Sequence, residues 1–208
     1  MKKINVAILD YKMGNITSLK NSLNYLSAKF EIVNNPKSLK NKTHIILPGV
    51  GSYKLAMKNI RSLKIEEPLK YYVNEKKINI LGVCLGMQLI GKSSTENGYT
   101  KGLGFIDNVV KSFTKKEVKN QKIPHVGFNS IKFNKENKFL KGIEPNSDFY
   151  FDHSFRMTKD NFSGNFALCN YGSDFLAAFN KNNIFGTQFH PEKSQSNGLN
   201  VLVNFLKS

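Results

Sequence analysis

The sequence predicts an α/β protein, built on an open, mixed but mostly parallel sheet with helices on both faces. Up to residue 92, short apolar runs that suit buried strands alternate with segments whose apolar residues recur at helical spacing. After residue 92, short aromatic-rich segments alternate in polarity, which indicates antiparallel or mixed strands. With 40% hydrophobic residues, no repeat and no low-complexity linker, the 208 residues are expected to form one domain, 1–208.

The first half is predicted to consist of strand-helix units. Residues 4–9 form a buried strand and residues 10–15 a loop, after which apolar residues recur at helical spacing from Ile16 onward. Asn15 and Thr17 are the two candidate caps of this helix. The other predicted elements are strands at 30–33, 45–47 and 78–83, a helical turn at 36–40, and helices at 53–63, 68–76 and 85–90.

The second half is predicted to add short strands, a turn and a closing helix. The turn covers residues 191–197, and the helix after it carries an apolar stripe at helical spacing. The strands are predicted near 105–113, 126–133, 149–155, 167–171, 175–179 and 184–189, and the stripe consists of Leu199, Leu202, Val203 and Leu206.

The net charge of +16 raises the question of a nucleic-acid partner, because clustered basic residues attract phosphate groups. Only Arg61 and Arg156 among the 31 basic residues are arginine, the side chain best suited to bidentate contacts with bases and phosphates. The lysines are scattered over the whole length of the chain. We therefore interpret the charge as a solvated, lysine-rich surface and expect no specific nucleic-acid binding.

The chain is expected to be cytoplasmic and to make no membrane contact. No apolar run approaches the roughly 18 residues of a membrane span, and Met1-Lys2-Lys3 leads into a strand-like segment instead of the apolar core of a signal peptide. Its two cysteines, Cys84 and Cys169, form neither a disulfide framework nor a C-x-x-C metal pair. Both are therefore expected to be reduced.

Cys84 lies where a predicted strand turns into a predicted helix, between Gly82 and Gly86. This G-x-C-x-G frame is the thiol counterpart of the G-x-S-x-G nucleophile elbow, in which small neighbours allow the sharp turn that exposes the nucleophile. The helix N-terminus favours a thiolate through its dipole, and its free N–H groups can donate to an oxyanion. A buried core cysteine is the alternative interpretation, and the flanking glycines argue against it.

Two further loops follow predicted strands at the same edge of the sheet, where functional residues gather in open α/β folds. The first, Pro48-Gly49-Val50-Gly51, can present backbone N–H groups to a neighbouring site. The second loop covers residues 186–192. In it, Pro191 biases His190 to an extended backbone, so that the His190 imidazole and the Glu192 carboxylate can project to the same side. Cys84, His190 and Glu192 are thus the candidate nucleophile, base and orienting acid.

The other three histidines have weaker claims to a catalytic role. His44 opens a strand, His125 follows a proline in a loop, and His153 lies between aromatic residues. A structural role is the favoured interpretation of each of these three side chains.

Three motifs follow one another along the chain at these predicted strand ends. They are Leu47-Pro48-Gly49-Val50-Gly51, Gly82-Val83-Cys84-Leu85-Gly86-Met87-Gln88 and Gln188-Phe189-His190-Pro191-Glu192-Lys193-Ser194. Together they resemble the signature motifs of the class I, triad-type glutamine amidotransferases. Within that class the chain resembles, over essentially its whole length, the HisH family of glutaminase subunits of imidazole glycerol phosphate synthase. Supporting segments are Asp10–Asn15, Pro124–Asn129 and Tyr150–Phe155.

The resemblance implies a flavodoxin-like three-layer sandwich and hydrolysis of glutamine to glutamate and ammonia, through a thioester at Cys84 assisted by His190 and Glu192. It implies a HisF-type (β/α)₈-barrel cyclase as partner in a heterodimer for histidine biosynthesis, with synthase activity only in the complex. No metal or organic cofactor is implied. The oxyanion and substrate-binding residues carried over are Gly49, Val50, Gly51, Leu85, Gln88, His153, Ser154 and Phe155, and the partner-facing residues are Asn15, Phe128, Tyr150 and Lys193.

Four positions depart from the usual family pattern. The family has Gly in place of Lys12, Trp in place of Phe128, a small apolar residue in place of Asp152 and Tyr in place of Phe155. None belongs to the triad, so glutamine hydrolysis for histidine synthesis is ranked first. The departures leave open a HisH-like paralogue that supplies ammonia for amidation of a surface-sugar precursor. A catalytically idle binding or regulatory module is the alternative of another class, and the intact triad argues against it.

Overall fold

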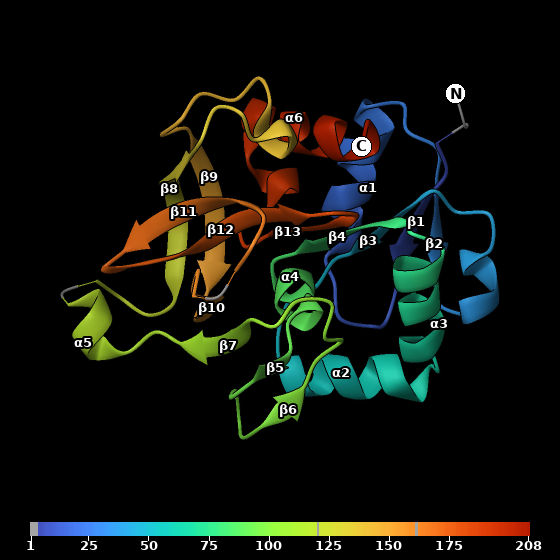
Figure 1. Ribbon diagram of the computed structural model, residues 1–208, viewed down its shortest axis with the longest axis horizontal. Coiled ribbons are helices and arrows are strands. Elements are labelled where there is room, and N and C mark those ends of the chain that lie inside the picture. Colours follow the sequence, from blue (N-terminus) through green and yellow to red (C-terminus); the bar gives the residue numbers. More distant parts are fainter. Residues whose placement is uncertain (1–3, 120, 161) are drawn as a thin grey trace.

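A nine-stranded sheet forms the centre of this computed structural model, which describes residues 4–119, 121–160 and 162–208 (Figure 1). Five neighbouring strands pair parallel to one another. Three of them, β1, β3 and β13, are buried along their whole length, as expected for strands covered by helices on both faces. In spatial order the five are β2 (Phe30–Val33), β1 (Val6–Leu9), β3 (His44–Leu47), β4 (Asn79–Val83) and β13 (Ile184–Thr187).

The other four strands continue the same sheet but pair antiparallel. The last two, β8 and β9, stand nearly upright at one side of the view in Figure 1, beyond the parallel strands. The prediction of an antiparallel or mixed second half is therefore confirmed. Continuing from β13, the strands are β12 (Ser173–Lys181), β11 (Asn165–Tyr171), β8 (His125–Phe133) and β9 (Asp148–His153).

A separate sheet of four short strands was not predicted from the sequence. Its strand β7 begins only at Val109, although a strand was predicted from residue 105. The N–H groups of Phe105 and Ile106 instead donate to the carbonyl of Ile90, at the C-terminus of α4, where helix carbonyls lack intrahelical partners. In spatial order the strands are β10 (Phe155–Met157), β7 (Val109–Ser112), β5 (Ser93–Ser94) and β6 (Thr100–Lys101).

Helices cover both faces of the large sheet (Figure 1), and the sheet divides the hydrophobic core into two parts. In α2, for example, the buried side chains stand at positions i, i+3, i+4 and i+7 from Tyr53 and line one face of the helix. The first core part contains residues of α1 (Ile16–Tyr25) and α6 (Gln195–Leu206). The second contains residues of α2 (Tyr53–Ser62), α3 (Glu66–Lys70) and α4 (Leu85–Ile90). The remaining helical segments are α5 (Lys115–Val118), the π-turn Tyr71–Glu75 and the 3₁₀ turns Pro36–Leu39, Lys138–Leu140 and Pro191–Lys193.

Two predicted helices are shifted along the chain. α3 begins two residues before Pro68, which is tolerated because the first N–H groups of a helix have no intrahelical partner. The last helix begins at Gln195, inside the predicted turn, and it buries Val201 and Phe205 instead of the predicted Leu199 and Val203. This helix carries apolar residues on more than one side, so their spacing alone does not determine which side faces the core.

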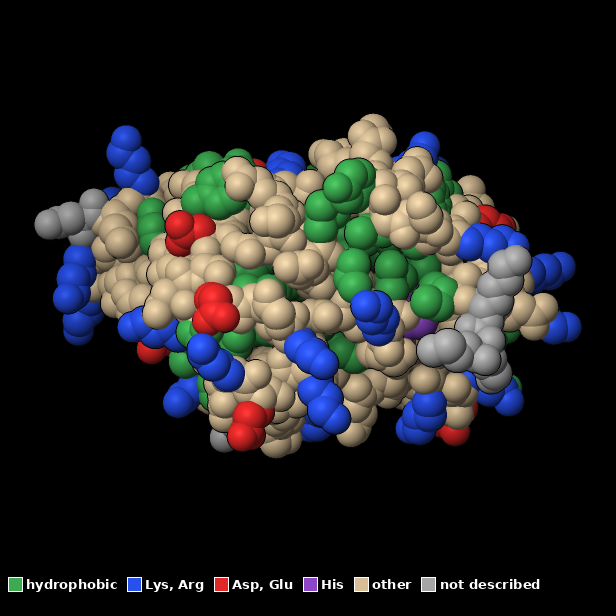
Figure 2. Space-filling model, turned by 90° about the horizontal axis from the view of Figure 1, so that it is seen from above, with side chains coloured by type: hydrophobic (Ala, Val, Ile, Leu, Met, Phe, Trp, Pro, Cys, Tyr) green, Lys and Arg blue, Asp and Glu red, His purple; other side chains and the backbone are tan. Residues whose placement is uncertain are grey.

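The surface carries its basic residues in a dispersed pattern. On the face seen in Figure 2, Lys and Arg side chains are spread from end to end between hydrophobic and uncharged atoms. This face therefore matches the scattered distribution expected from the sequence. No helix within residues 4–119, 121–160 and 162–208 is long and apolar enough to cross a membrane.

Candidate active site

Cys84 forms the turn between β4 and α4. Its backbone has φ of 53° and ψ of −109°, a conformation that favours glycine and that a residue with a side chain adopts only when its surroundings enforce it. The Cys84 N–H donates to the Thr187 carbonyl at 2.7 Å, which ties the turn to β13. On the other side, a Cβ atom at Gly86 would lie 1.7 Å from the Leu47 carbonyl oxygen, so only glycine fits against β3. Neighbouring strands thus hold the elbow from both sides.

His190 and Glu192 follow β13, whose end lies beside the end of β4. The His190 Nδ1 and Glu192 Oε1 atoms are 2.8 Å apart, and only 3% and 4% of the two side chains are exposed. The His190 N–H donates to the Tyr150 carbonyl at 2.9 Å, and the Ser194 hydroxyl donates to the His190 carbonyl at 2.6 Å. The imidazole is therefore held by its own backbone as well as by the carboxylate.

The surroundings of His190 favour its protonated form. Burial by itself disfavours the imidazolium, but the Cys84 sulfur and the Glu192 carboxylate outweigh it and raise the pKa of His190 to about 10. The His190 Nε2 atom is buried and has no hydrogen-bond partner among the residues that the structure describes. Nε2 is thus the ring nitrogen that can exchange a proton with the thiol, while Nδ1 is occupied by Glu192.

A cavity of about 310 Å³ opens beside Cys84. Seven of the eight residues predicted to bind an oxyanion or a substrate line this cavity, and Gly49 does not. Glu96, Pro124 and Asp152 also line it and were missed by sequence reasoning. Glu96 lies in a polar turn segment in which no motif distinguishes it from the other polar residues. The seven predicted residues are Val50, Gly51, Leu85, Gln88, His153, Ser154 and Phe155.

Glu96 brings a carboxylate to the wall of the cavity. Its Oε2 atom accepts the N–H of Tyr53 at 3.0 Å, at the N-terminus of α2, where the helix dipole stabilises a negative charge. This contact leaves Oε1 for other partners. Gln88 lies in the same cavity, and its side-chain amide donates to the Phe155 carbonyl at 2.8 Å. The cavity thus offers a carboxylate, a carboxamide and backbone groups to a small polar ligand.

The loop after β3 determines where the two candidate oxyanion donors point. The Leu85 N–H donates to the Gly49 carbonyl at 3.3 Å, and the Val50 N–H donates to the Met13 carbonyl at 3.1 Å. In a trans peptide the carbonyl and the N–H point in opposite directions, so the Gly49–Val50 peptide directs its N–H away from the elbow. One rotation of this peptide would free the Leu85 N–H and turn the Val50 N–H toward Cys84.

Tyr11 holds the peptide that precedes this one. Its hydroxyl donates to the Pro48 carbonyl, and burial raises the pKa of Tyr11, so that the hydroxyl stays protonated. The Tyr11 carbonyl in turn accepts the side-chain amide of Asn59 at 3.0 Å. A Cβ atom at Gly49 would lie 2.1 Å from the Tyr11 hydroxyl, which requires glycine there. Rotation is therefore confined to the Gly49–Val50 peptide.

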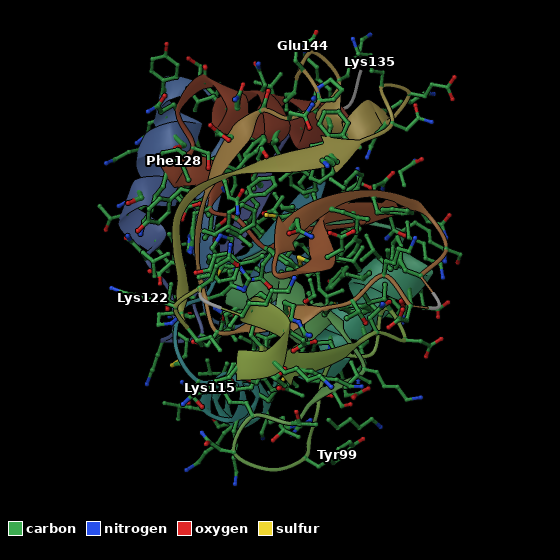
Figure 3. All side chains as sticks on the ribbon, turned by 90° about the vertical axis from the view of Figure 1, so that its left-hand side faces the viewer. Tyr99, Lys115, Lys122, Phe128, Lys135 and Glu144 are labelled. Atoms are coloured by element: carbon green, nitrogen blue, oxygen red, sulfur yellow. The ribbon has the colours of Figure 1, made fainter. Side chains whose placement is uncertain are left out.

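Three of the four predicted partner-facing residues lie together near His190. Phe128 lies on β8 (Figure 3) and is 53% exposed. Its ring centroid lies 5.6 Å from that of Tyr150. The Lys193 ammonium group lies 5.2 Å from the Tyr150 ring, whose centroid is 6.3 Å from that of His190. Asn15 is exposed at the N-cap position of α1.

The arrangement contains the groups that acyl transfer requires. Cys84 can act as nucleophile, His190 can take and return a proton, and two backbone N–H groups can be directed at the same reacting carbonyl. In the described parts of the chain, no group of three or more His, Cys, Asp or Glu side chains is placed to hold a metal ion.

Iodoacetamide is expected to modify Cys84 well before Cys169. Burial, together with Asp174 and Asp148, raises the pKa of Cys169 to about 12, so its reactive thiolate is scarce at neutral pH. Cys84 instead stands at a helix N-terminus and lines the cavity. Peptide mapping by mass spectrometry after a brief exposure measures both sites, with Cys84→Ala as the control that should take up almost no label. Equal labelling, or Cys169 first, would contradict this expectation.

The chain is similar to known proteins over almost its whole length. The family model described as "Glutamine amidotransferase class-I" matches residues 7–208. The chain is 45% identical over 203 residues to "Imidazole glycerol phosphate synthase subunit HisH 1" of Campylobacter jejuni (strain RM1221), covering 97% of this chain and 99% of that protein. It is 41% identical over 201 residues to "Imidazole glycerol phosphate synthase subunit HisH" of Leptospira interrogans, with coverage of 96% and 98%.

Two solved structures share the fold at low sequence identity. "Structure of PurLQS from Thermotoga maritima" matches with a TM-score of 0.73 and 19% identity, covering 99% of this chain and 98% of that one. "Crystal structure of glutamine amidotransferase" matches with a TM-score of 0.72 and 16% identity, covering 97% of each chain. At such identities the likeness extends to the fold alone, and it agrees with the predicted α/β class.

Proposed function

Because the chain belongs to the class-I glutamine amidotransferases, and within them to the HisH family of imidazole glycerol phosphate synthase subunits, we propose that it is the glutaminase subunit of that synthase. It hydrolyses glutamine to glutamate and ammonia, and the ammonia serves histidine biosynthesis in a HisF-type cyclase. The observation that carries this proposal is the buried His190–Glu192 pair beside Cys84, at one edge of the sheet. We also propose that residues 1–208 form a single domain, which the continuous nine-stranded sheet supports. The location proposed for the protein is the cytoplasm.

The reaction begins with attack of the Cys84 thiolate on the carboxamide carbon of glutamine. Protonated His190 gives its Nε2 proton to the departing ammonia, and a thioester to the glutamate side chain remains. Water then attacks the thioester while His190, now neutral, accepts its proton, and glutamate leaves. The raised pKa of His190 fits the first step, because the leaving group needs a proton at neutral pH. Glu192 orients the imidazole through Nδ1 throughout.

The cavity suits the amino-acid end of glutamine. The Glu96 carboxylate is the group that pairs with the substrate ammonium, since opposite charges attract strongly at a partly buried site. Gln88 and the backbone of Ser154 and Phe155 provide the hydrogen-bonding groups for the rest of the substrate. The carboxamide end of glutamine then lies toward Cys84, between the two backbone donors.

The free subunit is expected to be nearly inactive. In this conformation the Leu85 N–H is occupied by the Gly49 carbonyl, and the Val50 N–H is bonded to Met13. Neither donor stabilises an oxyanion at Cys84 until the Gly49–Val50 peptide rotates. One such donor contributes roughly 2.7–4 kcal/mol, which corresponds to a factor of roughly 10²–10³ in kcat. Contact of the partner with the Asp10–Asn15 loop, which carries the Met13 carbonyl, is the proposed trigger.

The departures from the family pattern lie around the face proposed for the partner or in the wall of the cavity. Lys12 has φ of 66°, a backbone conformation that glycine, the usual residue of the family at this position, adopts without strain. Phe128 is exposed beside Tyr150, and Asp152 adds an exposed carboxylate to the cavity wall. None of them removes a group that the reaction uses. They bear on which cyclase-like partner docks, not on glutamine hydrolysis.

Ammonia production under three conditions tests the proposal. The isolated chain, the chain with a histidine-pathway cyclase, and that complex with the cyclase's phosphoribulosyl-formimino nucleotide substrate are compared at saturating glutamine. Strong stimulation is expected only in the third condition, by a factor of roughly 10² or more, because the oxyanion donors are misdirected in the free chain.

The other outcomes of this experiment are equally informative. Full activity of the isolated chain would contradict the proposal that rotation of the Gly49–Val50 peptide controls the reaction. A glutaminase that never responds to the histidine-pathway ligand would instead favour the paralogue that feeds ammonia to amidation of a surface sugar. A chain that releases no ammonia, whether with the histidine-pathway cyclase or with a cyclase-like partner that amidates a sugar, would contradict the glutaminase proposal itself.

A further inference from the structure

Two buried histidines, which transfer no proton in the reaction proposed above, meet at the cavity wall: His153 lines the cavity, and His125 lies behind it. His125 opens β8, where the sequence predicted a loop, and His153 ends β9, and the strand register places them opposite each other. The His125 Nδ1 and His153 Nε2 atoms are 3.1 Å apart, which is a hydrogen-bond distance. Only 2% of His125 and 6% of His153 is exposed. The pair must therefore hold a defined set of protons.

Neighbouring groups determine which nitrogen carries each proton. The His153 Nδ1 atom lies 2.9 Å from the Phe155 carbonyl oxygen, which can only accept, so this Nδ1 carries a proton. Burial lowers the pKa of His125 to about 4, and burial together with His125 lowers the pKa of His153 to about 3. Both rings are thus neutral at pH 7 and hold one proton each. It follows that His125 Nδ1 is the donor and His153 Nε2 the acceptor.

The Phe155 carbonyl connects this pair to the cavity. It accepts a second hydrogen bond from the Gln88 side chain at 2.8 Å. The Gln88 Nε2 atom also lies 3.1 Å from Gln188 Oε1, and the Gln188 amide lies 3.8 Å from the Cys84 sulfur. Hydrogen bonds thus run from His125 to a side chain of the proposed glutamine site and on to the nucleophile.

We propose that His125 is a positioning residue for glutamine binding, which, as a donor to His153, keeps the Phe155 carbonyl and through it the Gln88 side chain in place. The inference rests on the proposed function, because glutamine is the ligand concerned. His125 is not among the residues that line the cavity, so it acts only through His153. Without this donor, His153 Nε2 becomes a buried acceptor that lacks a partner. The free-energy cost of this unsatisfied acceptor favours rotation of the ring or uptake of a proton.

Two substitutions of His125 separate this role from packing. The His125 ring stacks on Tyr171 at 4.0 Å and on Phe151 at 4.8 Å between centroids, so His125→Phe preserves the stack and removes the donor. His125→Asn loses the stack, but its amide nitrogen is bonded to Cγ, as Nδ1 is, and restores the donor. His125→Phe should therefore weaken glutamine binding more than His125→Asn does, whereas His125→Asn should lower the stability more.

The kinetic constants and the Tm of both variants test the inference in the complex with cyclase and its ligand. His125→Phe is expected to raise KM for glutamine roughly 5-fold or more, with kcat changed less than about 2-fold. Its Tm should fall less than that of His125→Asn, because the stack remains and only one buried acceptor loses its partner. His125→Asn is expected to lower Tm while its KM stays within about 2-fold of the wild-type value.

His44→Phe is the matched control. His44 is also buried and meets Phe205 edge-on at 5.1 Å, but it opens β3 and so lies at the end of the parallel strands opposite to Cys84. The KM of the His44→Phe variant for glutamine should therefore equal that of the wild type. A KM that rises whenever Tm falls across the three variants would overturn the inference, as would a wild-type KM in His125→Phe.

A measurement that needs no turnover keeps this inference distinct from the proposed function. With ¹⁵N-labelled imidazoles and only four histidines to assign, NMR at pH 7 should show a proton on Nδ1 and none on Nε2 of both His125 and His153. A proton on His153 Nε2 would overturn the inference at any level of activity. If the wild-type chain hydrolyses no glutamine, calorimetric titration with glutamine replaces KM, and equal affinities of wild type and His125→Phe would overturn it.

Discussion

Cys84→Ala is expected to abolish glutamine-dependent ammonia release, with a loss on the order of 10⁴-fold or more. In the proposed mechanism the thiolate is the nucleophile that forms the thioester and the leaving group when water hydrolyses it. The other cysteine, Cys169, is buried on β11, and its pKa is raised to about 12. The substitution removes a single sulfur atom, whose hydrogen bonds with the Asp152 carbonyl and the Gln188 amide are both long, at 3.8 Å. Glutaminase activity is measured in the complex with the cyclase and its ligand.

Two controls show whether the loss is chemical. The cyclase reaction with free ammonium should persist in the Cys84→Ala complex, because that chemistry belongs to the partner. Cys169→Ala should retain glutaminase activity, because Cys169 lies away from the cavity on β11. Appreciable glutaminase activity in Cys84→Ala would disprove the thioester mechanism.

His190→Ala is expected to lower kcat by roughly 10³-fold or more, and Glu192→Gln by a smaller factor of roughly 10 to 10². The imidazole transfers the protons itself, whereas the carboxylate orients it and stabilises its charge. A glutamine at position 192 can still accept the hydrogen bond of the Nδ1–H group through its side-chain oxygen, so the tautomer is retained. What is lost is one of the charges that raise the pKa of His190.

The pH profile of kcat distinguishes this explanation from a loss of folding. Because Glu192 raises the pKa of His190, Glu192→Gln should shift the limb that reports on His190 to lower pH. Glu144→Gln makes the same chemical change on a carboxylate that is 82% exposed, and it should leave both rate and profile unchanged. A Glu192→Gln variant as inactive as His190→Ala would show that the carboxylate does more than orient and stabilise the ring.

Much of the fold could be predicted because burial leaves a local record in the sequence. The strand predicted at residues 45–47 needs only one added residue, because a short apolar run bounded by polar residues identifies a strand covered on both faces. The strand predicted at residues 30–33 also has the predicted bounds, although it is a partly exposed edge strand of the sheet. The small sheet left no such record. Its strands are only two to four residues long, too short for a periodic pattern to emerge.

Candidate residues of the site were recognisable where function demands an unusual local sequence. The glycines around Cys84 are visible in the sequence because the elbow excludes side chains. Glu96 had no such signal, because its importance comes from the turn that brings its carboxylate to the cavity. The histidine pair was equally hidden, since His125 and His153 meet only through the pairing of β8 with β9.

By itself, the sequence determined the order of the strands that form the large sheet, the strand-to-helix turn at Cys84 and the proximity of His190 to Glu192, because each depends on residues that are close neighbours in the chain. Only the tertiary structure decided how these parts act on one another. The parallel pairing of β4 with β13 brings His190 to Cys84 across more than a hundred residues, and the contact of Val50 with Met13 directs an oxyanion donor away from the site. Such contacts depend on the closing of long loops, whose partners no local pattern of residues specifies.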